Sequence, residues 1–474
     1  MCLLVAGGTV GGFFAGRYSN HDAYVSKALP LILSENTMTS LYSVIGSQLA
    51  DPIEARAYGQ LYGVSGDDRD ALTRRLQAVA WVPAYQPAPV VGNIARPQLG
   101  DEPHINLLGF RDERQGYVIK APRTVRIFLT GGSTAWGSGA SSQKQTISYL
   151  LEHLINTQMS RKTGYRYEVI NTAFPAWTTT QEKLLIEQRL VDMHPDVVLM
   201  FSGNNDIHWT REGRDIRWFH SPMDDNHMLL LNELYRSSGH PEWTFPAPSL
   251  SSPLDCAGLA RISARNVEDA AIATGRVKAH LIFALQPNVA TTSKRLSVRE
   301  QRLAEVPNKP YWESCYRAMR AELSRVGAPN YRLIDLSRAF GELDDRTELF
   351  VDSYHVADLG NRLIAQALAA RIDWRSIVPN AAATGGGKPL EIVIFDRSPS
   401  LRPDGTATLR IVPSRFNPNL RVVFDSSVLP TVVAADALTA AVPASLGAAK
   451  GEHHVYVVDG MTGEASRAVA VVAR

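Results

Sequence analysis

The sequence predicts an α/β protein: a three-layer α/β/α domain built on a parallel sheet, with a helical N-terminal extension before it and an all-β sandwich after it. Between about residues 123 and 372, short continuous apolar runs alternate with segments of helical periodicity, the pattern of a parallel sheet covered on both faces. Residues 377–389 have the composition of a linker. From residue 390 onward, short strand-like segments recur between Pro, Gly, Asn and Asp, which is typical of a sandwich.

The parallel sheet is expected to contain five strands. Helical segments over 146–155 and 179–190 follow the first two of them. Ligands of open parallel sheets bind at the carboxyl ends of the strands, so a site is expected in the polar turns there. The five apolar runs are Val125–Leu129, Tyr167–Ile170, Val197–Phe201, Ala279–Leu285 and Tyr331–Ile334.

Residues 1–100 are expected to form an N-terminal segment of helical and irregular structure, with helices over 38–50 and 67–82. The run Leu3–Gly16 is apolar and rich in small residues, but it is shorter than the roughly 20 residues of a membrane span and lacks a positively charged start. It indicates either the remainder of an export or anchor segment or a buried terminal segment. The export interpretation predicts a secreted, periplasmic or membrane-anchored protein.

The parallel-sheet domain is expected to cover residues 101–376, and the sandwich residues 390–474. Within the sandwich, residues 438–444 and 454–458 resemble the immunoglobulin-like IPT/TIG fold. Its expected strands are Leu390–Phe395, Ala407–Val412, Leu420–Asp425, His453–Val458 and Arg467–Val472.

Charge and cysteine content narrow the function classes. The net charge is +2, without the basic stripe of a nucleic-acid-binding protein, so no nucleic-acid partner is expected. The three cysteines, Cys2, Cys256 and Cys315, form no Cys-x-x-Cys pair or Cys/His cluster, so no zinc site is expected. The reaction proposed from the catalytic residues below is expected to use neither a metal nor a cofactor. Cys256 and Cys315 either form a disulfide in an exported protein or remain two separate thiols.

Three short blocks carry groups suited to nucleophilic catalysis. Ser133 follows the first predicted strand at the start of a helix, where free backbone N–H groups favour a developing negative charge. Asn205 follows the third strand and can donate its amide to an oxyanion. Asp352 precedes His355 by three residues, close enough to fix the imidazole that would take a proton from Ser133.

In order and spacing, these blocks resemble those of the SGNH (GDSL-like) hydrolase family. The resemblance spans about residues 100–372 and implies a serine esterase in which Ser133 is the nucleophile, His355 the base and Asp352 its orienting partner. The first block fits with Gly132 at a position where many members carry Asp. The matching segments are Asn106–Arg111, Gly131–Gly137, Gly203–Asp206, Ala284–Pro287 and Asp352–His355.

The resemblance implies an oxyanion hole formed by the backbone N–H groups of Ser133 and Ala176 and the side-chain amide of Asn205. The family has glycine where this chain has Ala176. With alanine in place the N–H is expected to serve if φ is negative and to fail if φ is positive, and we expect a negative φ at Ala176. Asp206 is expected to be structural, held by local backbone hydrogen bonds.

The long segment 207–250 follows the Asn205 block and is rich in aromatic residues and arginine. It is interpreted either as a lid or sugar-binding wall or as a packed loop with solvated arginines. The residues expected to contact the substrate are Gly132, Trp177, His208 and Trp209.

The resemblance suggests removal of O-acetyl groups from bacterial surface saccharides. The expected partner is an ester-bearing small molecule or acylated saccharide, with membrane contact only through an N-terminal anchor. An O-acyltransferase or a lipid or aryl esterase with the same triad remains open. In a different class, the chain would be a non-catalytic saccharide-binding or adhesion protein.

Overall fold

The fold comes from a computed structural model of the chain. It describes residues 52–64, 68–77, 79, 82–98, 102–114, 120, 123–218, 221–237, 239, 254–305, 308–377, 390–395, 406–424, 427–443, 451–460 and 465–473. The run Leu3–Gly16, the predicted helix over 38–50 and all but the first residue of the predicted linker 377–389 lie outside these residues.

A five-stranded parallel sheet forms the centre of the α/β domain, as the apolar runs predicted. Its strand order is β4-β3-β5-β6-β7. The strands carry almost only buried side chains in the middle of the sheet, because helices cover both faces. The bounds are Thr124–Gly131 (β3), Arg166–Asn171 (β4), Val197–Ser202 (β5), His280–Leu285 (β6) and Tyr331–Asp335 (β7).

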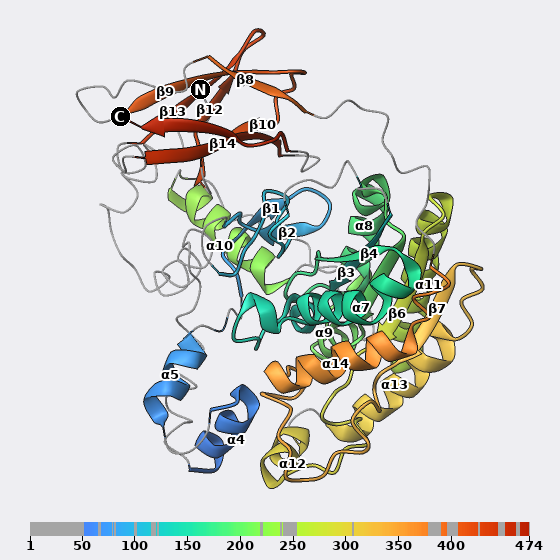
Figure 1. The fold of residues 1–474 in the computed structure, drawn as a ribbon. Helices are drawn as coiled ribbons and strands as arrows, with labels where there is room; N and C mark the ends of the chain where they lie inside the picture. Colours follow the sequence, from blue (N-terminus) through green and yellow to red (C-terminus); the bar gives the residue numbers. More distant parts are fainter. Residues whose placement is uncertain are drawn as a thin grey trace.

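Two helical layers enclose this sheet, which confirms the predicted α/β/α architecture (Figure 1). On one face α7 packs against α14, and on the other α11 packs against α8 and α13. The chain turns to opposite sides after β3 and after β5, so the crevice between their carboxyl ends is a topological switch point. The bounds are Ile147–Thr163 (α7), Thr179–Gln188 (α8), Cys256–Arg276 (α11), Lys309–Leu323 (α13) and Asp358–Arg371 (α14).

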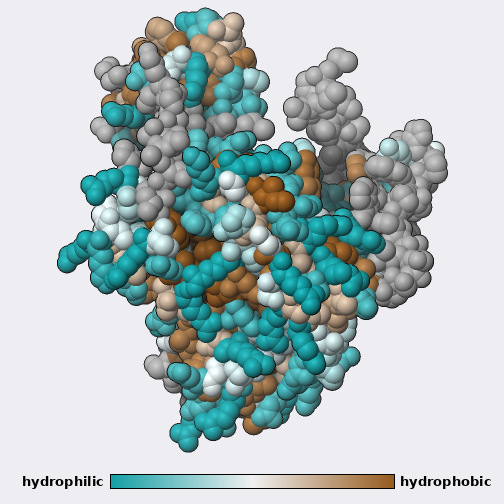
Figure 2. Space-filling model, turned by 90° about the vertical axis from the view of Figure 1, so that its right-hand side faces the viewer, coloured by the Kyte–Doolittle hydropathy of each residue, from teal (hydrophilic) through white to brown (hydrophobic). Residues whose placement is uncertain are grey.

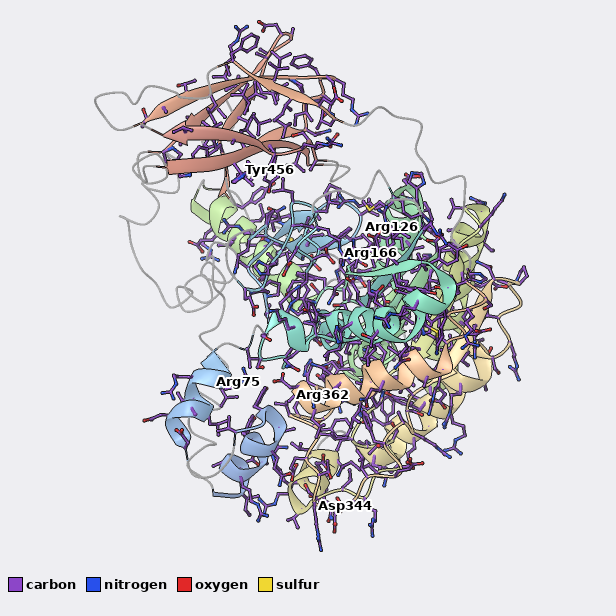
Figure 3. All side chains as sticks on the ribbon, viewed as in Figure 1. Arg75, Arg126, Arg166, Asp344, Arg362 and Tyr456 are labelled. Carbon is purple, nitrogen blue, oxygen red and sulfur yellow. A yellow bond between two sulfur atoms is a disulfide. The ribbon has the colours of Figure 1, made fainter. Side chains whose placement is uncertain are left out.

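The described residues before the sheet form two helices and a hairpin. The helices are Pro52–Tyr62 (α4) and Arg69–Gln77 (α5), and both pack on the segment around α14. Figure 3 labels Arg75 of α5 and Arg362 of α14, and both charges act on the carboxyl group of Asp358. The strands Tyr85–Ala88 (β1) and Gly92–Ala95 (β2) form an antiparallel hairpin. This hairpin was missed in the sequence, because prolines at 87 and 89 read as breakers and are tolerated only in edge strands.

Within the described part of the segment between β5 and α11, the chain forms two helices and a single 3-10 turn. Helix α9 spans Asn204–Arg211, the turn η3 spans Ile216–Trp218 and α10 spans Pro222–Ser237. In α10, Asp224 accepts a 2.5 Å hydrogen bond from the Asn93 amide, and the His227 ring lies 5.6 Å from the Tyr85 ring. Helix α10 therefore packs on the β1–β2 hairpin.

The C-terminal region is a sandwich of two antiparallel four-stranded sheets, as predicted. One sheet has the order β11-β10-β14-β15 and the other β12-β13-β9-β8, and they share a core separate from that of the α/β domain. The five expected strands are present, and three further short strands were not expected. The bounds are Ile392–Ile394 (β8), Ala407–Pro413 (β9), Leu420–Phe424 (β10), Ser427–Val428 (β11), Thr431–Val433 (β12), Leu438–Val442 (β13), Gly451–Asp459 (β14) and Val469–Ala473 (β15).

Cys256 and Cys315 are joined by a disulfide that links the start of α11 to the middle of α13. Of the two alternatives left by the sequence, the structure therefore contains the bonded pair. No helix in the described ranges is long and apolar enough to cross a membrane. Hydrophilic residues predominate on the face of the molecule in Figure 2, with apolar residues gathered near its middle.

Candidate active site

Ser133 is placed by a tight turn between β3 and the one-turn helix α6 (Ser133–Trp136). Gly131 has a φ of 151°, and a Cβ there would overlap the Phe201 carbonyl of the neighbouring strand. Glycine is therefore required for the strand to end against β5 and release the serine into the crevice. The Ser133 side chain is half-buried at the start of α6, where the first N–H groups of a helix have no intrahelical acceptor.

A buried arginine braces the helix that carries the nucleophile. Arg111 is 1% exposed, donates from Nη1 to the Trp136 carbonyl at 3.1 Å, and lies 5.3 Å above the Trp136 ring. The amide of Asn171, at the end of β4, donates to the same carbonyl at 3.1 Å. Burial lowers the pKa of Arg111 to about 10, which leaves the guanidinium charged at neutral pH. Arg111 lay in a segment quoted for the family resemblance, but nothing in the sequence indicated this bracing contact.

The structure brings Ser133, His355 and Asp352 into one hydrogen-bonded chain. His355 Nε2 lies 2.6 Å from Ser133 Oγ, and His355 Nδ1 lies 2.6 Å from Asp352 Oδ2. The predicted contacts between the three residues are confirmed, although 222 positions separate Ser133 from His355. Such a chain gives the imidazole one tautomer, with Nδ1–H donating to the carboxylate and Nε2 free to accept the serine proton.

Asp352 is held ionised by its neighbours. Its Oδ1 accepts the backbone N–H groups of Tyr354 at 3.0 Å and His355 at 2.8 Å. Burial raises the pKa of Asp352, but the His355 charge and the hydrogen bonds outweigh it and hold the pKa at about 2. Because 45% of its side chain is exposed, the gain in stability is moderated by solvent. This gain is complete above the ordinary Asp pKa of about 3.9 and is lost as the pH falls through about 2.

Asn205 lies in the first turn of α9, beside the turn that carries Ser133. Its Nδ2 donates to the Trp177 carbonyl at 2.7 Å, which fixes the amide and leaves its second hydrogen for another acceptor. A Cβ on Gly132 would lie only 2.1 Å from this Nδ2, much closer than van der Waals contact allows. Glycine at position 132 therefore allows the Asn205 amide to lie beside the nucleophile. Gly132 was expected to contact the substrate, and this remains a prediction. In the structure, Gly132 lies against the Asn205 side chain.

The expected negative φ at Ala176 is wrong: its φ is 67°. Phe174, Pro175, Ala176 and Trp177 form a turn closed by a 3.3 Å hydrogen bond from the Trp177 N–H to the Phe174 carbonyl. Proline at the second position and a positive φ at the third define a type II turn, which explains the family's glycine there. In the part of the chain that the structure describes, the Ala176 N–H has no acceptor. It remains available as a donor, at a conformational cost of about 1–2 kcal/mol.

Asp206 is structural, but through different contacts from those expected. Its carboxylate is fully buried and accepts hydrogen bonds from Thr179 of α8 at 2.6 Å and Ser263 of α11 at 2.8 Å. Burial raises the pKa of Asp206 despite these bonds. The side chain thus joins α9 to two other helices rather than closing its own loop.

An aromatic wall, formed by His208, Trp209 and Tyr354, lies beside the triad. The His208 ring is 4.5 Å from the Trp209 ring and 5.9 Å from Tyr354, which in turn lies 4.8 Å from the His355 ring. Trp209 Nε1 donates to the Ala176 carbonyl at 3.3 Å. Burial and the Arg211 charge lower the pKa of His208, so the wall is uncharged at neutral pH.

Two residues of this region differ in role from the sequence expectation. Trp177 is 2% exposed and packs against Phe174 in the core, so only its carbonyl reaches the site. Tyr354 was not among the expected substrate-binding residues, although an aromatic residue between Asp352 and His355 was the signal that could have identified it. Among the described residues, no group of three His, Cys, Asp or Glu side chains could hold a metal ion.

Comparison with known proteins gives matches only among solved structures. No family model matches the chain, and no curated protein matches it. The acetyl xylan esterase AlAXEase is 17% identical over 52% of this chain and 100% of its own, with a TM-score of 0.32. Axe2, an acetylxylan esterase from Geobacillus stearothermophilus, is 13% identical over 53% of this chain and 95% of its own, with a TM-score of 0.31. LAE5, an alpha/beta hydrolase enzyme from the metagenome of Lake Arreo, is 16% identical over 54% and 97%, with a TM-score of 0.33. Similarity this low gives no information about activity or substrate. Both must be inferred from the residues of this chain.

Proposed function

We propose that the chain is a serine esterase of the SGNH type, which hydrolyses carboxylic esters through an acyl-enzyme on Ser133. The observation that carries the proposal is the continuous chain from Ser133 Oγ through His355 to Asp352, with both hydrogen bonds at 2.6 Å. A serine hydroxyl needs an adjacent base to attack at neutral pH, and an imidazole oriented by a carboxylate is such a base.

In the proposed reaction, Ser133 Oγ attacks the ester carbonyl carbon while His355 Nε2 takes its proton. The tetrahedral intermediate collapses with loss of the alcohol, which receives that proton from His355. Water then attacks the acyl-enzyme in the same way, giving the carboxylic acid and free Ser133. Asp352 stays ionised throughout and stabilises the imidazolium formed in each half of the reaction.

The oxyanion would be stabilised by three donors, the N–H groups of Ser133 and Ala176 and the second amide hydrogen of Asn205. The Asn205 amide is fixed by the Trp177 carbonyl, so little reorganisation is needed when the charge develops. Each such donor typically contributes about 2.7–4 kcal/mol to the transition state.

As substrates we propose O-acetyl groups on bacterial surface saccharides. The aromatic wall supports this proposal, because ring faces suit the apolar faces of sugars. The Cys256–Cys315 disulfide supports a secreted, periplasmic or membrane-anchored location, where such bonds persist.

The test compares the purified chain with Ser133→Ala on short acyl esters and on a panel of acetylated saccharides, lipid esters and aryl esters. We expect turnover of acetyl esters by the wild type and its loss by at least about a thousandfold in the variant. Acetyl release preferentially from saccharides supports the proposed substrate. Preference for lipid or aryl esters would replace it, and transfer of the acyl group to an added saccharide would indicate an acyltransferase. Full activity in Ser133→Ala would overturn the mechanism.

A further inference from the structure

Two neighbouring residues of α12 (Val298–Glu305), Arg299 and Glu300, form hydrogen bonds with the backbone just before the triad residue Asp352. Arg299 donates from Nη1 to the Phe350 carbonyl at 2.6 Å and from Nη2 to the Val351 carbonyl at 2.7 Å. Glu300 accepts the backbone N–H of Leu349 at 3.0 Å. Arg299 is 2% exposed and Glu300 is fully buried, so solvent does not compete for these bonds.

The backbone held by Arg299 and Glu300 is one arm of a short hairpin that carries both Asp352 and His355. Phe350 pairs with Val356 across the hairpin, and the Val351 N–H donates to the His355 carbonyl at 2.8 Å. A shift of the first arm would therefore move the Asp352 carboxylate and the His355 ring relative to Ser133. The tip of the hairpin has a separate outside contact, because the Val289 N–H donates to the Ser353 carbonyl at 3.0 Å. The first arm, which leads directly into Asp352, is held by Arg299 and Glu300.

The N-terminal helix α4 holds this arginine in place. Glu54 Oε2 accepts from Arg299 Nε at 2.7 Å, and the Tyr58 ring lies 5.3 Å from the guanidinium carbon. Tyr58 belongs to a small core that also contains Val351. Figure 1 shows α4 beside α12 and the start of α14, so the N-terminal extension covers the back of the triad hairpin.

We propose that Arg299, held by Glu54 of α4, is a positioning residue that fixes the Asp352–His355 hairpin for catalysis. The planar guanidinium reaches two carbonyls and a carboxylate at once, which a lysine ammonium cannot reproduce in the same plane. Displacing a catalytic group by about 1 Å can cost on the order of a hundredfold in rate. The N-terminal extension is then a part of the catalytic unit. This inference rests on the proposed esterase function.

The first test is Arg299→Lys in the full chain, with Arg126→Lys as the matched control. Arg126 is also 2% exposed and also bonds a carboxylate and a backbone carbonyl, those of Glu168 and Met193. It lies near the start of β3, whereas Ser133 follows its end, and Figure 3 shows it far from α12. We expect kcat on a small acetyl ester to fall at least tenfold in Arg299→Lys, with KM within threefold of wild type. Arg126→Lys should keep kcat within threefold even where its Tm falls. Equal kcat values in the two variants would overturn the proposal.

A second test asks whether Arg299 acts through the triad. In a His355→Ala background, Arg299→Lys should change the residual kcat by less than twofold, because the base that the hairpin positions against Ser133 is gone. The same tenfold loss in that background would overturn the proposal. If Arg299→Lys does not fold, Glu54→Gln at the partly exposed end of the contact replaces it, and a kcat equal to wild type would overturn the proposal. A wild-type chain without turnover would instead reject the esterase function and leave the contacts unexplained.

Discussion

At the scale of single residues, the proposed oxyanion hole depends on two positions, Gly132 and Ala176. At the first a side chain would not fit, and at the second the side chain strains the backbone. Gly132 has no side chain, and a Cβ at this position would lie only 2.1 Å from the Asn205 amide nitrogen. Ala176 carries a methyl group in a left-handed turn where a glycine would be unstrained. Packing against Asn205 thus requires glycine at position 132, whereas alanine at position 176 carries a cost in conformational energy.

Ala176→Gly should relieve this cost without loss of catalysis. The relief of about 1–2 kcal/mol is partly offset by the about 0.4–1 kcal/mol that glycine adds to the entropy of the unfolded chain. We expect the free energy of unfolding to rise by between zero and about 1.5 kcal/mol, measured by denaturant titration. The kcat should stay within tenfold of wild type, or about 1.36 kcal/mol of barrier, because the N–H donor is retained.

Asn205→Ala is the comparison for that variant, since it removes a donor rather than a strained methyl group. Its kcat should fall by about a hundredfold to a thousandfold with little change in KM. A large loss of kcat in Ala176→Gly would contradict the assignment of a backbone role to this turn. Proline at 176 is unsuitable as a test, because it removes the donor and also cannot adopt a φ of 67°.

At the scale of elements, helix α13 supports the site from behind. Tyr316 Oη lies 2.5 Å from Asn204 Oδ1 and 2.9 Å from the Gln286 carbonyl, which fixes the residue before Asn205. The Trp312 ring lies 6.4 Å from that of Tyr354 in the aromatic wall. The disulfide at Cys315 joins α13 to α11. This one covalent link therefore stabilises the helix that contacts both the Asn205 turn and the aromatic wall.

Cys256→Ala with Cys315→Ala should therefore lower stability more than activity. The disulfide closes a loop of 59 residues, and links of that length typically contribute about 2–4 kcal/mol. We expect the calorimetric Tm of the α/β domain to fall by roughly 4–16 °C, while kcat at 25 °C stays within threefold. The wild type treated with a reductant should show the same Tm as the double variant. A Tm within 2 °C of the oxidised wild type would mean that the link adds no stability.

At the scale of the whole molecule, the features that could be predicted from the sequence are those encoded by short local patterns. The five strands of the parallel sheet were predictable because buried strands read as continuous apolar runs. The contact between Ser133 and His355 could be predicted because their short motifs occur in the order and spacing of the SGNH hydrolases that the sequence resembles. Contacts such as Arg299 with Glu54 join residues 245 positions apart, and no local pattern reports them. Two further features were missed for a related reason. The left-handed backbone at Ala176 depends on the geometry of its turn, and the short strands β11 and β12 depend on their pairing with neighbouring strands.

The separate cores predict that the sandwich can be removed without loss of the reaction. Every residue of the proposed active site precedes residue 377, and Trp374 and Ile377 belong to the core of the α/β domain. A chain ending at Ile377 should therefore fold and turn over a small soluble acetyl ester with kcat/KM within threefold of wild type. If the sandwich binds saccharide, kcat/KM on an acetylated polymer should fall by tenfold or more in the same preparation. Parallel assays of both chains on both substrates measure this, with Ser133→Ala in each chain as the blank. An equal loss on the small ester and the polymer would show that the sandwich is needed for the fold of the α/β domain rather than for binding.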